Sequence, residues 1–185
     1  MNIIKTRIDG VFVIEPKVFG DERGYFFESF NSREFFEKTG LNITFVQDNE
    51  SKSRYGVLRG MHFQLPPYTQ SKLVRVVKGK VLDVVVDIRK GSLTYGKYEK
   101  CELTEENHRQ FFVPKGMAHG FVVLSDEAIF QYKCDDFYHP EAEGAISWND
   151  PDIAIKWPIP IEEVLLSEKD RHHPCLKDIE SPFVY

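Results

Sequence analysis

Residues 73–88 read LVRVVKGKVLDVVVDI, two mostly apolar runs that meet at Lys78-Gly79-Lys80. Both runs are rich in valine, leucine and isoleucine, a composition typical of buried β-strands. Gly79 can take the positive φ that a tight turn requires. The stretch therefore predicts a β-hairpin whose strands cover residues 73–77 and 81–88.

The same pattern continues through most of the chain, and helical periodicity is scarce. Short runs rich in Val, Ile, Phe and Tyr alternate with Gly, Pro, Asp and Asn, as strands alternate with turns. Ten strands are predicted, over residues 11–14, 25–30, 43–47, 57–63, 73–77, 81–88, 98–103, 110–113, 120–124 and 128–134. Strands in this number and at this spacing favour a sandwich or a barrel.

One helix is predicted, over residues 32–39. Asn31 or Ser32 can accept hydrogen bonds from the free N–H groups of the first turn. Phe35 and Phe36 offer an apolar side, and Gly40 provides the C-terminal stop. This helix would be an addition to an all-β fold.

Proline becomes frequent after residue 140 and interrupts every periodic stretch, at positions 151, 158, 160, 174 and 182. We therefore expect irregular chain with short strands or helical turns there. A chain of 185 residues can bury about 70% of the surface that its unfolded form exposes. Together these features predict one domain over residues 1–185, with an irregular segment from about residue 140 packed on it.

Charge and hydropathy exclude several classes of protein. The 24 Lys and Arg against 29 Asp and Glu give a net charge of -5, so no broad basic surface attracts nucleic acid or an anionic membrane. No apolar run approaches the roughly 20 residues of a membrane span, and the N-terminus lacks the pattern of a secretory signal. The three cysteines, at positions 101, 134 and 175, suit reduced thiols. We expect a cytoplasmic protein with no nucleic-acid or membrane partner.

Two segments combine ionisable residues with turn residues inside this apolar pattern: residues 59–64, RGMHFQ, and residues 114–120, PKGMAHG. The second has the Pro-x-Gly-x-x-His spacing and resembles the second motif of cupins, which are metal-binding jelly rolls. The first, together with Lys72 and Gly79 beyond it, resembles the first cupin motif and aligns with it at three ligand positions. His62, Gln64, Lys72 and His119 then stand at the four metal-ligand positions. The resemblance implies an all-β, cupin-type jelly roll with a few short helices.

Two of these four positions do not suit a metal ion. Gln64 and Lys72 stand where cupins have imidazole or carboxylate donors, and a lysine ammonium has no lone pair to offer. We therefore expect neither a metal nor another cofactor. A neutral imidazole such as His62 can instead remove a proton next to a carbonyl, while Lys72 holds the enolate oxygen. Tyr132, on a predicted strand, could supply a proton from the opposite side and so invert a stereocentre.

Eight ordered blocks resemble the dTDP-4-dehydrorhamnose 3,5-epimerase family, and the resemblance covers nearly the whole chain. The blocks are residues 21–26 with Glu28, 47–49, 58–64, 72–75, 114–121, Tyr132, Tyr138 and 167–170. The resemblance implies epimerisation at C3 and C5 of dTDP-4-dehydro-6-deoxy-D-glucose through enolates, in dTDP-L-rhamnose biosynthesis. It also implies a homodimer and no cofactor.

The family resemblance implies roles for individual residues. His62 would be the proton acceptor, Tyr132 the proton donor, Asp170 the carboxylate that orients His62, and Lys72 the catalytic cation. Tyr138 would stack on the thymine. The other residues implied to line the substrate site are Arg23, Glu28, Gln47, Asp48, Asn49, Arg59, His119, Glu143 and Lys169, together with Lys72.

Three other functions fit parts of this pattern. A mono-epimerase or ketoisomerase acting on a related dTDP-4-keto-6-deoxy sugar would use the same base, although Tyr132 favours inversion at both carbons. A ligand-binding cupin without activity would need no pair of His62 and Asp170, and a cupin oxygenase would need a metal. Strict alternation also places Arg59 on the opposite face of its strand from His62, so a bulge at Gly60 is needed to bring them together.

Overall fold

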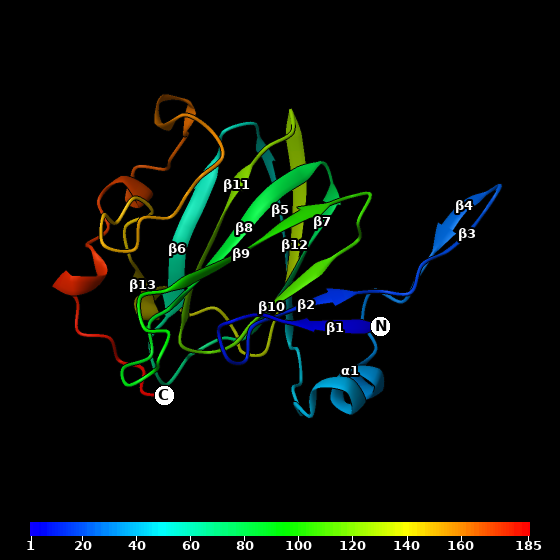
Figure 1. Ribbon diagram of the computed structural model, residues 1–185, viewed down its shortest axis with the longest axis horizontal. Helices are drawn as coiled ribbons and strands as arrows, with labels where there is room; N and C mark the ends of the chain where they lie inside the picture. The colour runs from blue at the N-terminus through cyan, green and yellow to red at the C-terminus, as the bar shows by residue number, and fades with distance from the viewer.

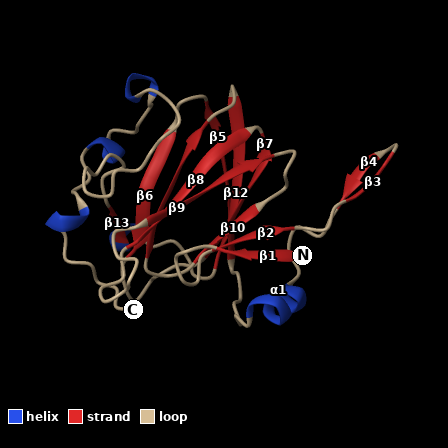
Figure 2. Ribbon diagram, in the orientation of Figure 1, coloured by secondary structure: helices blue, strands red, loops and turns tan.

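The computed structural model describes residues 1–185, which form two antiparallel sheets facing each other and a separate two-stranded arm (Figures 1 and 2). The six-stranded sheet has the order β1 (Asn2–Lys5), β2 (Phe12–Glu15), β10 (Gln110–Val113), β7 (Lys72–Lys78), β12 (Glu127–Cys134) and β5 (Gln47–Arg54). The five-stranded sheet has the order β13 (Glu143–Ala145), β6 (Leu58–Gln64), β11 (Met117–Val123), β8 (Lys80–Asp87) and β9 (Tyr98–Thr104). The arm consists of β3 (Phe19–Asp21) and β4 (Gly24–Phe26). The all-β jelly-roll prediction is confirmed.

The core between the two sheets follows from the alternation of each strand. Val74 and Val76 on β7 and Phe130 on β12 face inward from the six-stranded sheet. Val85 on β8 and Phe121 on β11 meet them from the five-stranded sheet, and all five side chains are at most 5% exposed. Burying such side chains stabilises the fold by about 1.5–3 kcal/mol each. This packing holds the two sheets at a fixed separation around the polar site at one end.

The predicted hairpin of residues 73–88 is wrong, although both of its strands exist. β7 pairs with β10 and β12 in one sheet, whereas β8 pairs with β11 and β9 in the other. Gly79, the single residue between them, has φ 79° and turns the chain from one sheet to the other. A Cβ there would lie 2.1 Å from the Glu127 carbonyl oxygen, so glycine is required.

The helix prediction is confirmed at both ends. α1 covers Ser32–Thr39, Asn31 accepts a hydrogen bond from the Glu34 N–H, and Gly40 adopts the left-handed conformation. Phe35 is fully buried against Phe12 and Phe112. Phe36 is 51% exposed, so only one of the two expected phenylalanines is buried.

Several strand boundaries also differ from the prediction. Residues 43–46 contain no strand, and β5 runs instead through the polar sequence QDNESKSR. The predicted strand 25–30 shortens to β4, and β1, β3 and β13 were not predicted. β5 is an edge strand that exposes alternate residues to solvent, so apolar composition does not mark it.

The segment after residue 140 is mostly irregular and covers the outer face of the five-stranded sheet. Besides β13, it has four 3₁₀-helices: η1 (Pro140–Ala142), η2 (Ile161–Glu163), η3 (Lys169–Arg171) and η4 (Leu176–Asp178). Ile146, Trp148 and Leu176 pack there against Val84 and Val86 of β8. This packing brings η3, and with it Asp170, against β6. No helix of the structure has the length and apolar character needed to span a membrane.

Candidate active site

A polar hollow lies between the two sheets and collects residues from five strands. Its lining residues are Asn49, Glu50, Ser51, Arg59, His62, Lys72, His119, Gly120, Phe121, Phe130 and Tyr132. Six of the predicted site residues therefore line one space: Asn49, Arg59, His62, Lys72, His119 and Tyr132. β6 and β12 belong to opposing sheets, so His62 and Tyr132 enter the hollow from opposite walls.

His62 is held by a buried carboxylate. Its Nε2 lies 2.6 Å from Oδ1 of Asp170, which is contributed by η3. Oδ2 of Asp170 accepts a hydrogen bond of 2.8 Å from the Ser167 hydroxyl. Burial of Asp170 opposes its ionisation, but the hydrogen bond from His62 and the others hold its pKa below the ordinary value. Since Asp170 engages Nε2, the other ring nitrogen of His62, Nδ1, is available to take a proton.

Lys72 and Tyr132 lie side by side on β7 and β12. The Lys72 ammonium is 5.9 Å from the centre of the Tyr132 ring. Desolvation lowers the pKa of Lys72, and the nearby Cys134, Asp83 and Glu143 only partly offset this effect. Desolvation also raises the pKa of the Tyr132 phenol, which keeps it protonated. The hollow thus combines a cation for a developing oxyanion with a phenol that can donate a proton.

A second histidine–aspartate pair lies deeper in the hollow. His119 Nε2 is 2.9 Å and 3.0 Å from the two carboxylate oxygens of Asp83, and both side chains are buried. Desolvation raises the pKa of Asp83, although His119 and Lys72 oppose that shift. Asp83 was not predicted as a site residue. The available signal was a single carboxylate inside the apolar run of residues 81–86.

The bulge required at Gly60 is present. The pairing of β6 with β11 is in register at His62 and His119 but shifts before Arg59 and Phe121. Gly60 has φ 143°, and a Cβ there would lie 2.6 Å from the Cα of Gly120. Arg59 consequently lines the same hollow as His62, where its guanidinium donates to the Ser53 hydroxyl at 3.2 Å.

Four of the predicted substrate-site residues outside the hollow form a connected chain. Tyr138 donates its phenolic hydrogen to Oε2 of Glu143 at 2.7 Å, and Lys169 Nζ lies 2.5 Å from the same oxygen. The hydrogen bond to Glu143 raises the pKa of Tyr138 to about 12. The main-chain N–H of Tyr138 donates to Gln47, whose amide in turn donates to Asn49 in the hollow. Lys169, Glu143, Tyr138 and Gln47 are therefore connected in that order to Asn49, which lines the hollow.

Gln64, at a cupin ligand position, is used to hold the main chain. Its Nε2 donates to the His139 carbonyl at 3.0 Å, and its Oε1 accepts from the His139 N–H at 2.8 Å. The residue is 5% exposed. With Gln64 committed in this way and Lys72 unable to donate a lone pair, the residues at the cupin metal position do not fit a metal ion.

Three predicted residues lie away from this hollow. Arg23 is at the tip of the projecting arm, where its guanidinium pairs with Asp21 at 2.5 Å (Figure 1). Glu28 accepts hydrogen bonds from Asn31, beside the start of α1. Asp48 pairs with Lys133 at 2.9 Å on the outer face of the six-stranded sheet. Within one chain, the structure does not bring these residues to His62.

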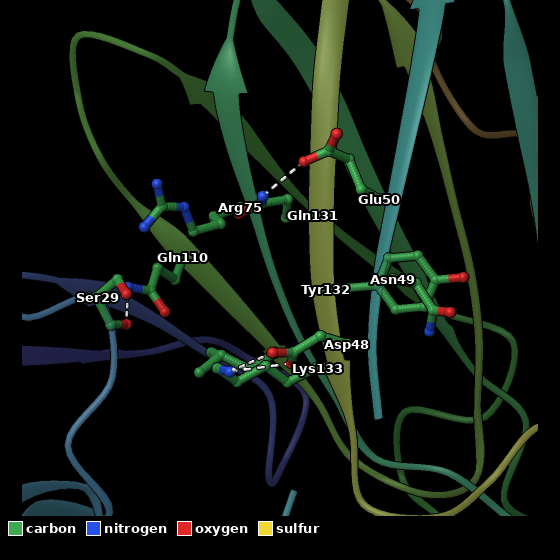
Figure 3. A pocket seen from close by; sticks show the side chains of 10 residues that line it. Ser29, Asp48, Asn49, Glu50, Arg75, Gln110, Gln131, Tyr132 and Lys133 are labelled. Carbon is green, nitrogen blue, oxygen red and sulfur yellow. Dashed lines mark hydrogen bonds and ion pairs between the residues drawn. The ribbon is translucent and has the colours of Figure 1, made fainter. Parts of the chain in front are cut away.

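A second hollow lies on that outer face, and Figure 3 shows its lining. Arg75, Gln110 and Ser29 lie on one side of the β12 ribbon, whereas the Tyr132 ring and the Asn49 amide point to the other side (Figure 3). Asn49, Glu50 and Tyr132 line both hollows, so the two spaces adjoin each other along β5 and β12.

Comparison with known proteins identifies the family of this chain. Residues 5–178 match the family described as dTDP-4-dehydrorhamnose 3,5-epimerase. A protein of that name from Shigella flexneri is 57% identical, over 92% of this chain and 93% of that protein. A crystal structure of dTDP-6-deoxy-D-glucose-3,5-epimerase from Legionella pneumophila, in complex with dTDP-4-keto-L-rhamnose, has a TM-score of 0.95 and 52% identity. That match covers 100% of this chain and 98% of the other.

A more distant structural match differs in its named activity. A 3'-monoepimerase from Streptomyces bikiniensis, in complex with dTDP-quinovose, has a TM-score of 0.89 and 35% identity, over 94% of this chain and 87% of that chain. The family match over residues 5–178, together with 57% identity over nearly the full length of a named relative, establishes the assignment. The chain belongs to the dTDP-4-dehydrorhamnose 3,5-epimerase family.

Proposed function

We propose that this chain epimerises C3 and C5 of dTDP-4-dehydro-6-deoxy-D-glucose, giving dTDP-4-dehydro-L-rhamnose for dTDP-L-rhamnose biosynthesis. The observation that carries the proposal is the placement of a carboxylate-held base, His62, and a phenol, Tyr132, on opposite walls of one hollow that also contains Lys72. This is the set of groups that proton removal and return on opposite faces of a sugar requires.

The 4-keto group makes both reactions possible with one set of residues. C3 and C5 are both bonded to the carbonyl carbon C4, so loss of a proton from either carbon gives an enolate with the charge on the same oxygen. His62 takes the proton on Nδ1, and Asp170 stabilises the imidazolium that forms. Lys72 stabilises the enolate oxygen, and its desolvated position strengthens that interaction.

Tyr132 returns a proton to the face opposite His62. Its raised pKa keeps the phenol protonated until the enolate forms, and its ring lies across the hollow from β6. Return of the proton from His62 would restore the original configuration, whereas donation from Tyr132 inverts it. His119, held by Asp83, and Arg59 add polar donors for the substrate in the same hollow.

The dTDP group binds beside the chain of residues that ends at Tyr138. That ring is 49% exposed, offers a flat face for thymine, and is fixed by Glu143 and by Gln47. Gln47 and Asn49 provide amide donors and acceptors, and Lys169 adds a cation near the phosphates. Asp48, on the outer face in this chain, belongs to the same proposed substrate-binding set.

The active form that we propose is a homodimer in the cytoplasm. The β3–β4 arm projects away from the rest of the molecule, and its Phe19, Tyr25 and Phe26 are all more than half exposed (Figure 1). A partner subunit would cover these rings. In that arrangement, Arg23 and Glu28 would reach the neighbour's substrate, and the forked guanidinium of Arg23 would suit a pyrophosphate.

Proton NMR in deuterated water tests this function directly. Incubation with the dTDP-4-keto sugar is expected to exchange both H3 and H5 and to yield the doubly inverted product. Exchange and inversion at C3 alone would identify a mono-epimerase, the activity named for the Streptomyces bikiniensis relative. Binding of the nucleotide sugar without any exchange would identify a non-catalytic cupin.

A further inference from the structure

A second histidine shares the carboxylate that orients His62. Asp170 Oδ1 lies 2.6 Å from His62 Nε2 and 3.3 Å from His173 Nε2, and the potential ligand atoms all lie within 4.8 Å of one another. The proposed epimerisation does not need His173. We propose that these three residues bind a divalent transition-metal ion, best suited to Zn²⁺, and that the bound ion inhibits the enzyme. The inhibition, but not the binding, rests on the proposed function.

The donor set matches a zinc site with one open position. Two imidazoles and one carboxylate are a ligand combination that zinc accepts, with a fourth position left for water. Tetrahedral Zn²⁺, with bonds of about 2.0–2.1 Å, holds its ligand atoms about 3.3 Å apart. Asp170 and His173 already have that separation. His62 and Asp170 need to move apart by about 0.7 Å from their 2.6 Å hydrogen bond. The two histidine nitrogens, which lie within 4.8 Å of each other, need to reach the same separation of about 3.3 Å through small side-chain movements.

The surroundings support such a site. Asp170 is fixed by Ser167, whose hydroxyl bonds Oδ2 and leaves Oδ1 facing the two histidines. A carboxylate oriented in this way by a neighbouring group is typical of metal ligands. The side chains of Asp170 and His173 are 6% and 13% exposed, whereas that of His62 is 30% exposed and gives an ion access from the hollow.

This site is distinct from the cupin metal position. The cupin alignment places Gln64, Lys72 and His119 around His62, and those residues do not fit a metal ion. The proposed site uses the other side of His62, where η3 and the residues that follow it approach β6.

Metal binding would prevent His62 from acting as a base, and it would do so without oxidation or cleavage of a covalent bond between heavy atoms. A neutral imidazole carries one proton and one free lone pair, on different nitrogens. A metal ion that takes the Nε2 lone pair of His62 forces the single proton onto Nδ1. The nitrogen that faces substrate then donates a hydrogen bond and cannot accept the proton from C3 or C5. The ion also draws Asp170 Oδ1 away from its hydrogen bond to His62.

Binding is tested with Co²⁺, which absorbs visible light in a tetrahedral site. The wild-type protein is expected to bind one Co²⁺ per chain. His173→Gln should weaken binding at least tenfold, because losing even an outer partner of a metal ligand costs about 10–100-fold. Glutamine can still donate to Asp170, and a matched thermal melt confirms that the variant is folded. His172→Gln is the control: His172 is 71% exposed and bonds Glu168 instead, so that variant should bind Co²⁺ like the wild type.

Inhibition is tested with Zn²⁺ in the epimerisation assay. Zn²⁺ should inhibit the wild type and His172→Gln, EDTA should restore full activity, and His173→Gln should need at least about tenfold more Zn²⁺. Failure to bind Co²⁺, or equal binding by His173→Gln and the wild type, overturns the site. Co²⁺ binding without Zn²⁺ inhibition of an active enzyme overturns the inhibitory role. Co²⁺ binding does not depend on catalysis, so an inactive wild type would contradict the proposed epimerisation and leave the metal site standing.

Discussion

At the scale of single residues, three side chains divide the proposed chemistry between them. His62 is connected to Asp170, Tyr132 lies on the opposing sheet, and Lys72 lies next to Tyr132. Each makes a different contribution to proton transfer, so each substitution should leave a different kinetic signature.

Replacing the base should abolish most catalysis while leaving nucleotide binding intact. His62→Ala is expected to lower kcat by at least the roughly 10²–10⁴-fold contributed by a general base. Asp170→Ala should lower kcat by a smaller factor, because it removes the group that orients His62 and leaves the imidazole in place. Rates of solvent deuterium exchange at C3 and C5 measure both effects. Near-normal exchange in folded His62→Ala would assign the base to another group.

Tyr132→Phe should separate proton loss from inversion. The variant keeps the ring but has no phenolic proton, so the fold should hold. His62 can still remove a proton and return deuterium to the same face. We therefore expect continued deuterium incorporation with far less doubly inverted product, measured in one NMR experiment. A strictly proportional fall in exchange and inversion would contradict a separate acid role for Tyr132.

The charge on Lys72 should limit activity at alkaline pH. Desolvation lowers its pKa below the ordinary value of 10.5, so the ammonium loses its proton at a lower pH than a surface lysine does. Because only the charged form stabilises the enolate, kcat should fall as pH rises through that lowered pKa. A profile of kcat against pH on the wild type measures the alkaline limb. In Lys72→Arg, whose guanidinium stays charged, that limb should disappear even if the overall rate is lower.

At the scale of structural elements, Gln64 connects the end of β6 to the loop that carries Tyr138. Its side-chain amide accepts from the main-chain N–H of His139 and donates to the C=O of the same residue, which is next to Tyr138 in the chain. The same loop leads into η1 and β13, which brings Glu143 beside Gln64. The position that binds metal in other cupins thus supports, in this chain, the loop that we propose to bind the nucleotide.

Gln64→Leu should disturb binding more than chemistry. The variant leaves the His139 N–H without its partner, which costs up to about 1–3 kcal/mol in the free energy of unfolding, whereas the His139 C=O still accepts from the Ala142 N–H. With the loop loosened, KM for the nucleotide sugar should rise severalfold while kcat changes less, because His62 and Tyr132 are untouched. Gln64→Glu keeps the acceptor for the His139 N–H and should retain part of the affinity. Equal losses of kcat in both variants, with KM unchanged, would contradict this role.

At the scale of the whole molecule, the projecting arm predicts that sites are completed between subunits. The β3–β4 arm, whose turn contains Arg23, and β6, which carries His62, lie at opposite sides of the molecule, although both residues are predicted site residues (Figure 1). A symmetric dimer would place each arm against the partner. Light scattering at micromolar concentration should therefore report two chains per particle.

Mixing two inactive variants tests whether the arm acts on its partner. Arg23→Ala and His62→Ala, unfolded and refolded together, should recover up to about a quarter of wild-type activity, because half of the dimers are mixed and each mixed dimer has one intact site. A mixture of His62→Ala and Tyr132→Phe is the control. It should recover no activity, since both residues line the same hollow of one chain and every site in a mixed dimer lacks one of them. A fully active monomer would rule out the shared site.

Much of the fold was predictable because strands and helix ends depend on local composition and on the residues at turns. The valine-rich runs became strands, and Asn31 and Gly40 bounded α1 at the expected residues. The motifs around His62 and His119, the lysine at position 72 and the tyrosine at position 132 indicated one chemistry, and the structure places these four residues around one hollow. Strands, helix caps and short motifs are each defined by residues that are close in the sequence, so they can be recognised without the structure.

Long-range pairing was decided only in three dimensions. β7 and β8 looked like a hairpin, yet each pairs with two strands of a different sheet. Their valines then pack against each other in the core between the sheets, which buries more apolar surface than a hairpin in one sheet would. Polar β5 is a strand only because it pairs with β12. The carboxylate of Asp83 inside an apolar run indicates a buried polar group, but its partner His119 is 36 residues away and is identified only by the packing of β8 on β11. Composition, spacing and the family resemblance therefore predicted the fold class, the helix and six of the residues that line the hollow. The sheet to which each strand belongs, the bulge that turns Arg59 inward and the pairing of each buried charge depended on packing between distant parts of the chain.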